Sequence, residues 1–364
     1  MTLHNVHFLD LPNAILLLIL KKLDNMDVLY SLLGINNQRL DNIVQKTTFT
    51  TILNFESISA NDDFCSISGQ ILNRFYFDIL PRIHCNVKCL ILESNSMEHI
   101  LIVGSYPNLI NFKLFNFNKE IFSRYFIEST RFVDGTHIYN EILSHMTRLR
   151  TFTFYVSTEN YVHDSTLRLS NNDIQETFKN MENQQVNCIV DFVDDVYVLC
   201  KVFSLPFRLD HFEWITNNFS TMIFNSVTYL MLFDRVSFKH EFFVRVARAF
   251  PLLKYLSVHN GKAPFWRFPK PHPVDNYSPI AEYLHLISLH FGFVSNCYVD
   301  QFLNETKTNL PRLIELKINY RQLKSATENF TRNETRRNYA MVKRLIVANS
   351  IVFSEDVYRY FPSS

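Results

Sequence analysis

Residues 8–29 read FLDLPNAILLLILKKLDNMDVL, and this stretch decides how the chain folds at its start. Pro12 suits the first turn of a helix, because its missing N–H would have no partner there and its φ is already helical. Apolar residues recur at helical spacing from Ile15 to Leu23, and Leu17 and Leu18 make the opposite face apolar as well. A short helix that is apolar on nearly all sides must be covered by its own chain on one side and by a partner on another.

Two more short helices are predicted directly after this one. Asp27 is placed to cap a helix from Val28 to Leu33, which Gly34 ends, and a third helix is expected from Asn37 to Gln45. A bundle of this size has too little core to be stable alone. Part of its apolar surface is therefore expected to bind another protein.

From about Phe8 to Phe55 the sequence resembles an F-box. The Leu-Pro pair that opens the motif is Leu11-Pro12, and apolar residues follow it at the family's positions. Ala14 stands where an acidic residue is common, and Gln38-Arg39-Leu40 replaces the usual basic-aromatic pair of the third helix. The alternative is an ordinary helical hairpin that opens an unrelated domain.

The resemblance implies a three-helix F-box domain over residues 1–55 that binds the Skp adaptor, and through it a cullin scaffold, of a ubiquitin ligase. The residues expected to contact this adaptor are Leu11, Pro12, Ile15, Leu16, Ile19, Leu23, Val28 and Leu32.

Composition leaves room for one large body behind this bundle. Of 364 residues, 47% are apolar and 15% aromatic, which is enough for a substantial core. A net charge of +1 gives no field that favours nucleic acid or a membrane surface as a partner. The cysteines lie scattered in apolar segments, as buried thiols of a reducing compartment do, so we expect a cytoplasmic or nuclear protein that is not secreted.

Beyond residue 55 an apolar triplet recurs at positions i, i+3 and i+5, and its last two members share one face of a strand. From Leu253 onward the triplets are roughly 30 residues apart, the length of a repeat that pairs one strand with one helix. The triplets are Val87-Leu90-Leu92, Leu109-Phe112-Leu114, Leu149-Phe152-Phe154, Val227-Leu230-Leu232, Leu253-Leu256-Val258, Leu284-Ile287-Leu289, Leu313-Leu316-Ile318 and Val342-Leu345-Val347.

This pattern resembles a leucine-rich repeat. It implies an α/β protein in which residues 56–364 form a leucine-rich-repeat-like solenoid with one parallel sheet, irregular before about residue 225, and the strand register between about 155 and 225 stays open. The alternative is a compact α/β domain with a mixed sheet. In the solenoid the buried positions are Leu256, Leu289, Leu316 and Leu345, and the outward ones are Tyr255, Ser257, Ser288, His290, Lys317, Asn319 and Arg344.

One loop departs from the repeat pattern. Residues 262–270 combine prolines with aromatic and basic residues directly after a predicted strand, which is the composition of an interface anchor. The loop could equally fold back over the side of the solenoid. The residues predicted to contact a target protein are Trp266, Arg267 and Phe268 of this loop, with Tyr255, His290 and Asn319 of the strands.

Motifs for catalysis or for a cofactor are missing from the sequence. The glycines form no phosphate-binding loop, and Cys85 and Cys89 beside His84 lack a second ligand pair at zinc-finger spacing. We therefore expect no catalytic residue, no cofactor and no metal. The predicted function is substrate recognition in a Skp–cullin–F-box ubiquitin ligase, whose target protein the sequence leaves unknown; the alternative is a non-catalytic interaction module that no longer joins a ligase.

Overall fold

The computed structural model describes residues 7–56, 67–117, 135–141, 143–161, 170–179, 184–193, 197–219, 222–263, 279–348, 357 and 360–361. Over these residues the fold is mixed α/β with mainly parallel sheets, and the described strands form no closed barrel. The chain divides into two compact units. The first holds Met1–Asn160, Leu167–Cys188 and Cys200–Leu205, and the second holds Tyr161–Thr166, Ile189–Leu199 and Pro206–Ser364.

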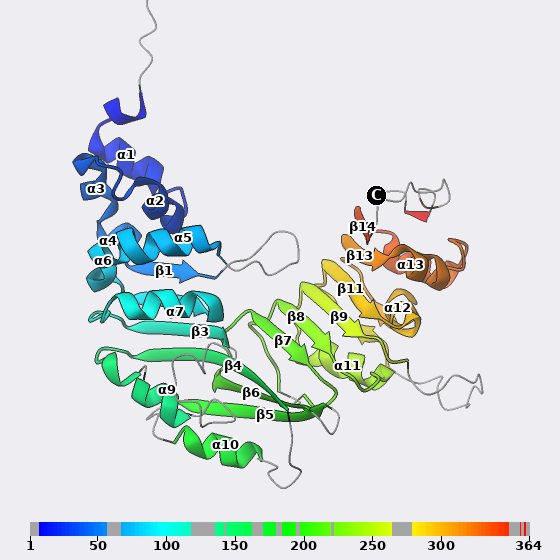
Figure 1. Ribbon diagram of the computed structural model, residues 1–364. Helices are drawn as coiled ribbons and strands as arrows, with labels where there is room; N and C mark the ends of the chain where they lie inside the picture. The colour runs from blue at the N-terminus through cyan, green and yellow to red at the C-terminus, as the bar shows by residue number, and fades with distance from the viewer. Residues whose placement is uncertain are drawn as a thin grey trace, which may run out of the picture. The chain divides into compact units, whose positions relative to one another are not determined.

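The first unit opens with a cluster of short helices (Figure 1). Asp24 caps the second of them, because its Oδ1 accepts a hydrogen bond from the Met26 N–H at 2.8 Å. The predicted cap at Asp27 is therefore wrong, and Asp27 instead lies in the first helical turn, where a carboxylate favours the helix dipole. Asn37 caps the third helix as expected. The helices are α1 (Asn13–Leu20), α2 (Asn25–Leu32), α3 (Gln38–Val44) and α4 (Thr47–Thr50), after a 3₁₀ turn at Phe8–Asp10.

Arg39 of α3 fixes the start of α1. Its guanidinium donates to the Asn13 side chain at 2.6 Å, to the Leu9 carbonyl at 2.5 Å and to the Leu11 carbonyl. The planar fork of an arginine can bind several acceptors at once. The residue that departs from the F-box pattern in sequence thus joins α3 to the segment that precedes α1.

The first sheet has six strands in the order β1-β2-β3-β4-β6-β5. Neighbours from β1 to β4 pair in parallel and place Leu53, Leu90, Phe112 and Phe152 in one buried row. Residues 52–55, at the end of the F-box-like stretch, form the first strand of this sheet. The strands are β1 (Ile52–Phe55), β2 (Cys89–Glu93), β3 (Asn111–Phe117), β4 (Thr151–Tyr161), β5 (Gln185–Val193) and β6 (Tyr197–Leu205).

The helices of the first unit connect and cover these strands. Figure 1 shows α5 and α7 along the sheet, and α7 contacts both β2 and β3. The helices are α5 (Gly69–Arg74), α6 (Leu80–Ile83), α7 (Ser94–Val103), α9 (Gly135–Glu141) and α10 (Asn171–Thr177).

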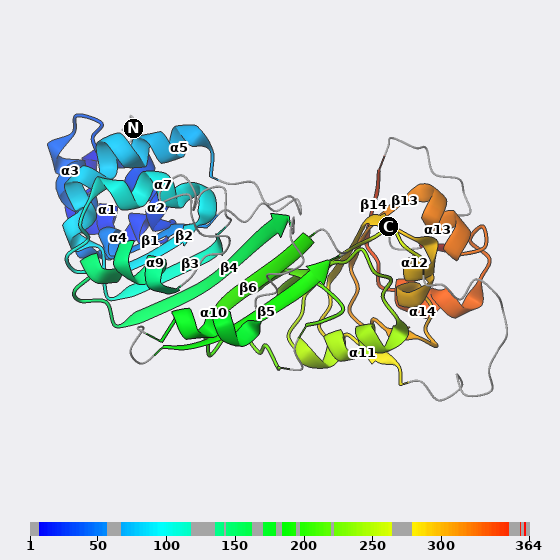
Figure 2. The same ribbon diagram turned by 60° about the horizontal axis from the view of Figure 1, so that its bottom comes forward.

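The sequential order of strands stops at β4. In Figure 2, β6 rather than β5 lies next to β4, so β5 becomes the last strand of this sheet. Strand β7 then begins a second six-stranded sheet. The prediction of one sheet for all the triplets is therefore wrong, because the two strands between residues 185 and 205, whose register the sequence left open, end the first sheet.

The second sheet is parallel throughout, in the order β14-β13-β11-β9-β8-β7. Its register puts Phe212, Leu230, Leu256, Leu289 and Leu316 in one buried row. The strands are β7 (His211–Ile215), β8 (Tyr229–Phe233), β9 (Tyr255–Asn260), β11 (Ser288–Val294), β13 (Glu315–Asn319) and β14 (Arg344–Ala348); a separate pair is β10 (Ala281–Glu282) with β12 (Thr308–Asn309).

Helices α11 (His240–Ala249), α12 (Asn296–Leu303) and α13 (Tyr320–Ala326) follow one another along one face of this sheet (Figure 1). Phenylalanines join the layers: the ring centroid of Phe302 in α12 lies 5.0 Å from that of Phe243 in α11 and 5.9 Å from that of Phe291 in β11. The opposite face of the sheet carries the positions between the buried leucines.

Two predictions about individual strand positions need correction. Leu345 is only half-buried, because β14 is the last strand of its sheet in the described part of the chain. The sixth triplet is out of register: β11 begins at Ser288, Leu284 is exposed, and the buried triplet is Leu286-Leu289-Phe291. Ser257 and Ser288 point to the outer face as predicted, although both are buried there: the Ser257 hydroxyl lies 2.8 Å from His259 Nε2, and the Ser288 hydroxyl donates to Glu315.

No helix in the described ranges combines the length and the apolar character that crossing a bilayer requires.

Candidate interaction surfaces

Helix α1 has one apolar face inside the helical cluster and another outside it. Leu16 and Leu20, four residues apart, are buried, whereas Ile15, Leu18 and Ile19 remain 42%, 60% and 40% exposed. A helix packed on one side would normally present polar side chains on the other. The outer face of α1 is therefore an uncovered apolar surface.

Apolar residues flank this face at both ends of the helix. Leu23 follows α1 and is 57% exposed, and Phe8 and Leu9 precede it and are also exposed. The hydrogen bonds from Arg39 hold the backbone of this preceding segment in place. We define the α1 surface as Phe8, Leu9, Ile15, Leu18, Ile19 and Leu23.

The residues predicted to bind an adaptor divide into two groups. Pro12, Ile15, Ile19 and Leu23 are exposed, and Leu11 and Leu32 are half-buried. Leu16 and Val28 lie in the core of the cluster, where they cannot contact a partner while the helices stay packed. Leu18 was missed, because a helix that is apolar all round does not reveal in sequence which face turns inward.

The outer face of the second sheet holds the strand residues predicted to bind a target. Tyr255 and Asn319 are exposed and His290 is half-buried. Ser257 lies between two histidines: its hydroxyl is 2.8 Å from His259 Nε2 and 3.3 Å from His290 Nδ1. Burial lowers the pKa of His259, because the imidazolium is poorly solvated there.

Charged groups on this face pair near β13 and β14. Glu315 accepts a hydrogen bond from the Ser288 hydroxyl at 2.9 Å and forms an ion pair with Arg344 at 2.7 Å. Glu315 and Arg344 therefore neutralise each other on this face, and Lys317 of β13 lies at an outward position beside them.

The aromatic loop residues Trp266, Arg267 and Phe268 lie outside the described residues, so their predicted role stays a prediction. Two hydrogen bonds hold the described backbone before and after residues 264–278. The Tyr298 hydroxyl of α12 donates to the Lys262 carbonyl at 2.7 Å, and His240 Nε2–H of α11 donates to the Pro279 carbonyl at 2.8 Å.

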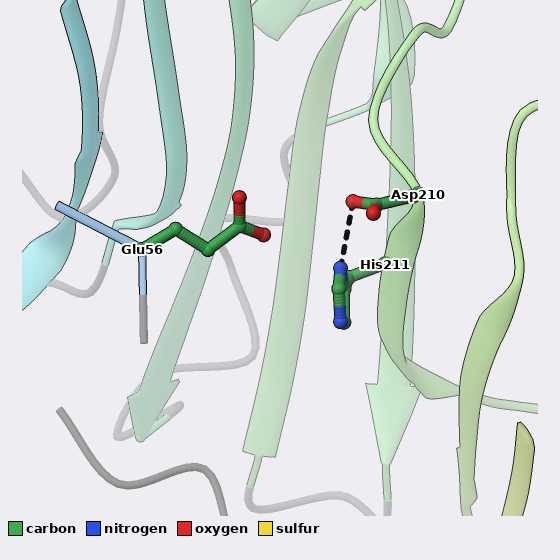
Figure 3. A group of neighbouring side chains, drawn as sticks. All are labelled: Glu56, Asp210 and His211. Atoms are coloured by element: carbon green, nitrogen blue, oxygen red, sulfur yellow. Dashed lines mark hydrogen bonds and ion pairs between the residues drawn. The ribbon is translucent and has the colours of Figure 1, made fainter. Parts of the chain in front are cut away.

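Few His, Cys, Asp and Glu side chains lie close together in the part of the chain that the structure describes. Asp210 and His211 form a pair with 2.7 Å between Oδ1 and Nδ1 (Figure 3). Glu56, also drawn there, belongs to the first unit and the pair to the second. Within either unit taken alone, the described residues bring no three such ligands together, and a zinc site needs at least three.

Cys85 and His84 lie close together, with 3.2 Å between Sγ and Nε2, but Cys89 does not complete a site. Burial raises the pKa of the Cys89 thiol, although Lys113 opposes the shift.

A cavity of about 650 Å³ lies in the second unit, where α11 ends and β10 begins. Val244, Phe250, Leu253 and Tyr283 give it mainly apolar walls. The Tyr283 hydroxyl is already bound to the Phe243 carbonyl at 2.9 Å. Arg248, Glu282 and His285 also line the cavity, so its wall carries ionisable side chains beside the apolar ones.

No protein-family model and no curated protein matches this chain.

Proposed function

We propose that this protein is the substrate-recognition subunit of a Skp–cullin–F-box ubiquitin ligase. In this proposal the N-terminal helices are an F-box domain that binds the Skp adaptor, and the parallel strands with their helices are a leucine-rich-repeat-like solenoid that binds the target. The observation that carries the proposal is the uncovered α1 surface.

The energetics of the α1 surface support a protein partner. Fully burying a leucine or isoleucine side chain stabilises an association by about 1.5–3 kcal/mol, so several half-exposed ones amount to several kcal/mol together. An exposed apolar surface promotes aggregation of a protein that has no partner. An adaptor that covers the surface would remove it from water, and this burial would contribute to the affinity of the complex.

The arrangement of the strands supports the second half of the proposal. Parallel neighbours that follow chain order, with helices along one face, are what stacked strand–helix repeats produce. Strands β8, β9, β11 and β13 each contribute one leucine to a buried row that runs across the sheet, and the opposite face of the sheet is available for a target.

Such a receptor needs no catalytic group of its own. It raises the local concentration of a target lysine beside a conjugating enzyme that another subunit carries, and proximity alone accelerates transfer.

The test is a pull-down of the purified full-length chain with a purified Skp adaptor. The wild type should be retained, and Ile19→Asp with Leu23→Asp should abolish retention, because two carboxylates would be buried in the interface without partners. Ile102→Asp is the matched control, since Ile102 is 61% exposed on α7 of the same unit. If the adaptor does not retain the wild type, the ligase proposal fails and a plain interaction module replaces it.

A further inference from the structure

Two cysteine side chains touch inside the first sheet. The sulfur atoms of Cys188 in β5 and Cys200 in β6 lie 3.9 Å apart. Both residues are buried, with exposed fractions of 2% and 1%, and both belong to the first unit. Two thiols at this separation are in van der Waals contact, and a disulfide would bring their sulfur atoms to about 2.05 Å.

The strands that carry these cysteines form a hairpin. Figure 2 shows β5 beside β6, and only residues 194–196 separate the two strands along the chain. A connection this short can join antiparallel strands but not parallel ones, which need a crossover of about a dozen residues. Residues that face each other across antiparallel strands have Cα atoms about 4.5–5.5 Å apart, and a disulfide spans about 4.4–6.8 Å. The backbone of the hairpin is therefore already spaced for a disulfide, and rotation of the two side chains can close the remaining gap.

Strand β6 is held on its other side by β4. The Thr158 hydroxyl donates to the Cys200 carbonyl at 3.4 Å, and the Phe154 N–H donates to Ser204 Oγ at 3.1 Å. Strand β5 is the last strand of this sheet in the described part of the chain. Strands at the edge of a sheet open locally at a lower free energy than inner strands, so a small oxidant can reach Cys188 without unfolding of the whole sheet.

We propose that Cys188 and Cys200 form a reversible disulfide, which ties β5 to β6 when the chain meets a small-molecule disulfide as oxidant. One thiol loses its proton, and the thiolate attacks a sulfur of the oxidant, which gives a mixed disulfide and releases one small thiol. The second protein thiolate then attacks the protein sulfur of the mixed disulfide and displaces the other small thiol. The protein gives up two protons and two electrons, and the oxidant is reduced to two thiols.

The bond would change the opening of the hairpin. A disulfide between Cys188 and Cys200 closes a loop over residues 189–199 and excludes the states in which β5 separates from β6. Excess small thiol reverses the exchange, so the dithiol is the form kept in a reducing compartment. The inference concerns the first sheet alone and holds whether or not the chain binds an adaptor.

The test is oxidation of the folded full-length chain with oxidised glutathione, at a concentration at which the exposed Cys85 carries glutathione. Remaining thiols are alkylated in denaturant, and the chain is digested with trypsin without reductant. No Lys or Arg lies between the two cysteines, so trypsin leaves both in one peptide, residues 180–201. The mass of this peptide should be that of the dithiol less two hydrogens, with no alkyl group, and reduced glutathione should restore two alkylatable thiols.

Hydrogen exchange measures whether the bond ties the strands together. Amides of β5 and β6 should exchange about tenfold more slowly, or slower still, in the oxidised chain than in the reduced chain. Cys200→Ala should abolish the mass change and the protection. Cys297→Ala is the matched control, a half-buried cysteine of the second unit, and should abolish neither.

The wild-type peptide decides the question even if Cys200→Ala fails to fold. The inference is overturned if both thiols of the folded chain are alkylated, if either one ends as a mixed disulfide with glutathione, or if the bond forms only after urea unfolds the chain. It is also overturned if the bond forms and exchange in β5 and β6 does not change.

Discussion

At the scale of single residues, Arg39 shows how a departure from a sequence pattern can be structural. Its guanidinium holds two backbone carbonyls ahead of α1 and the side chain of Asn13. A lysine would keep the positive charge, but its single ammonium group cannot reproduce the three hydrogen bonds that the planar guanidinium makes.

We therefore expect Arg39→Lys to loosen the start of α1 by about 1–2 kcal/mol, which is about tenfold faster amide exchange in α1. The measurement is hydrogen exchange on the full-length chain. Arg82→Lys is the matched control, because Arg82 makes only a 3.7 Å ion pair with Asp41 and is largely exposed. Equal exchange in both variants would show that the fork does not hold α1.

His259 should make the stability of the second unit depend on pH. Burial holds its folded pKa below the ordinary value of 6.5, so the unfolded chain binds more protons as the pH falls through 6.5. Stability contributed by neutral His259 is present above that value and is lost progressively down to the lowered folded pKa.

The expected result is that His259→Gln flattens the decrease in unfolding free energy between about pH 7.5 and 5.5. Both tryptophans of the chain, Trp214 and Trp266, belong to the second unit, so tryptophan fluorescence during urea unfolding reports on it. An identical pH slope in wild type and variant would contradict the assignment.

The sequence pattern predicts which residues are buried where only one face of an element is apolar. It does not do so where both faces are apolar. The alternation in β9 correctly placed Leu256 inside and Tyr255 outside. In α1 both faces are apolar, so the sequence could not tell buried Leu16 from exposed Leu18. The register shift between Phe212 and Ile215 in β7 was not predicted, because it arises from pairing with β8, about which the local sequence pattern carries no information.

At the scale of elements, the buried row formed by Phe212, Leu230, Leu256, Leu289 and Leu316 runs across the second sheet. Leu289 in β11 is fully buried between two paired strands, whereas Leu345 in β14 occupies the same register position but is half-buried. The two residues form a matched pair for testing what burial between repeats contributes.

We expect Leu289→Ala to reduce the unfolding free energy of the second unit by about 2–5 kcal/mol, because it leaves a cavity in a closed layer. Leu345→Ala should cost clearly less, since its surroundings are already partly open. Urea unfolding followed by tryptophan fluorescence measures both. Equal losses would mean that the end strand is as tightly packed as the middle of the sheet.

Sequence reasoning located most of the repeated strands but not all. The triplets at Leu90, Phe112, Leu256 and Leu316 lie in parallel strands as predicted. Strand β1 was hidden within the F-box-like stretch, since Leu53 and Phe55 fit the end of a helical domain equally well.

At the scale of the whole molecule, the sequence indicated a mixed α/β chain with parallel strands but not its division into two sheets. The first sheet ends with the strands between residues 185 and 205, because β5 and β6 join it out of chain order and β7 belongs to the second sheet. Pairing order between strands depends on contacts distant in sequence, and apolar spacing carries no information about it.

We propose that a Skp adaptor covers the α1 surface, and hydrogen exchange of the full-length chain with and without the purified adaptor is the decisive measurement. We expect amides of α1 and α2 to exchange more slowly in the presence of the adaptor. Ile19→Asp with Leu23→Asp should abolish this protection, while Ile102→Asp should not. Unchanged exchange in α1 at saturating adaptor, or protection confined to another part of the chain, would contradict it.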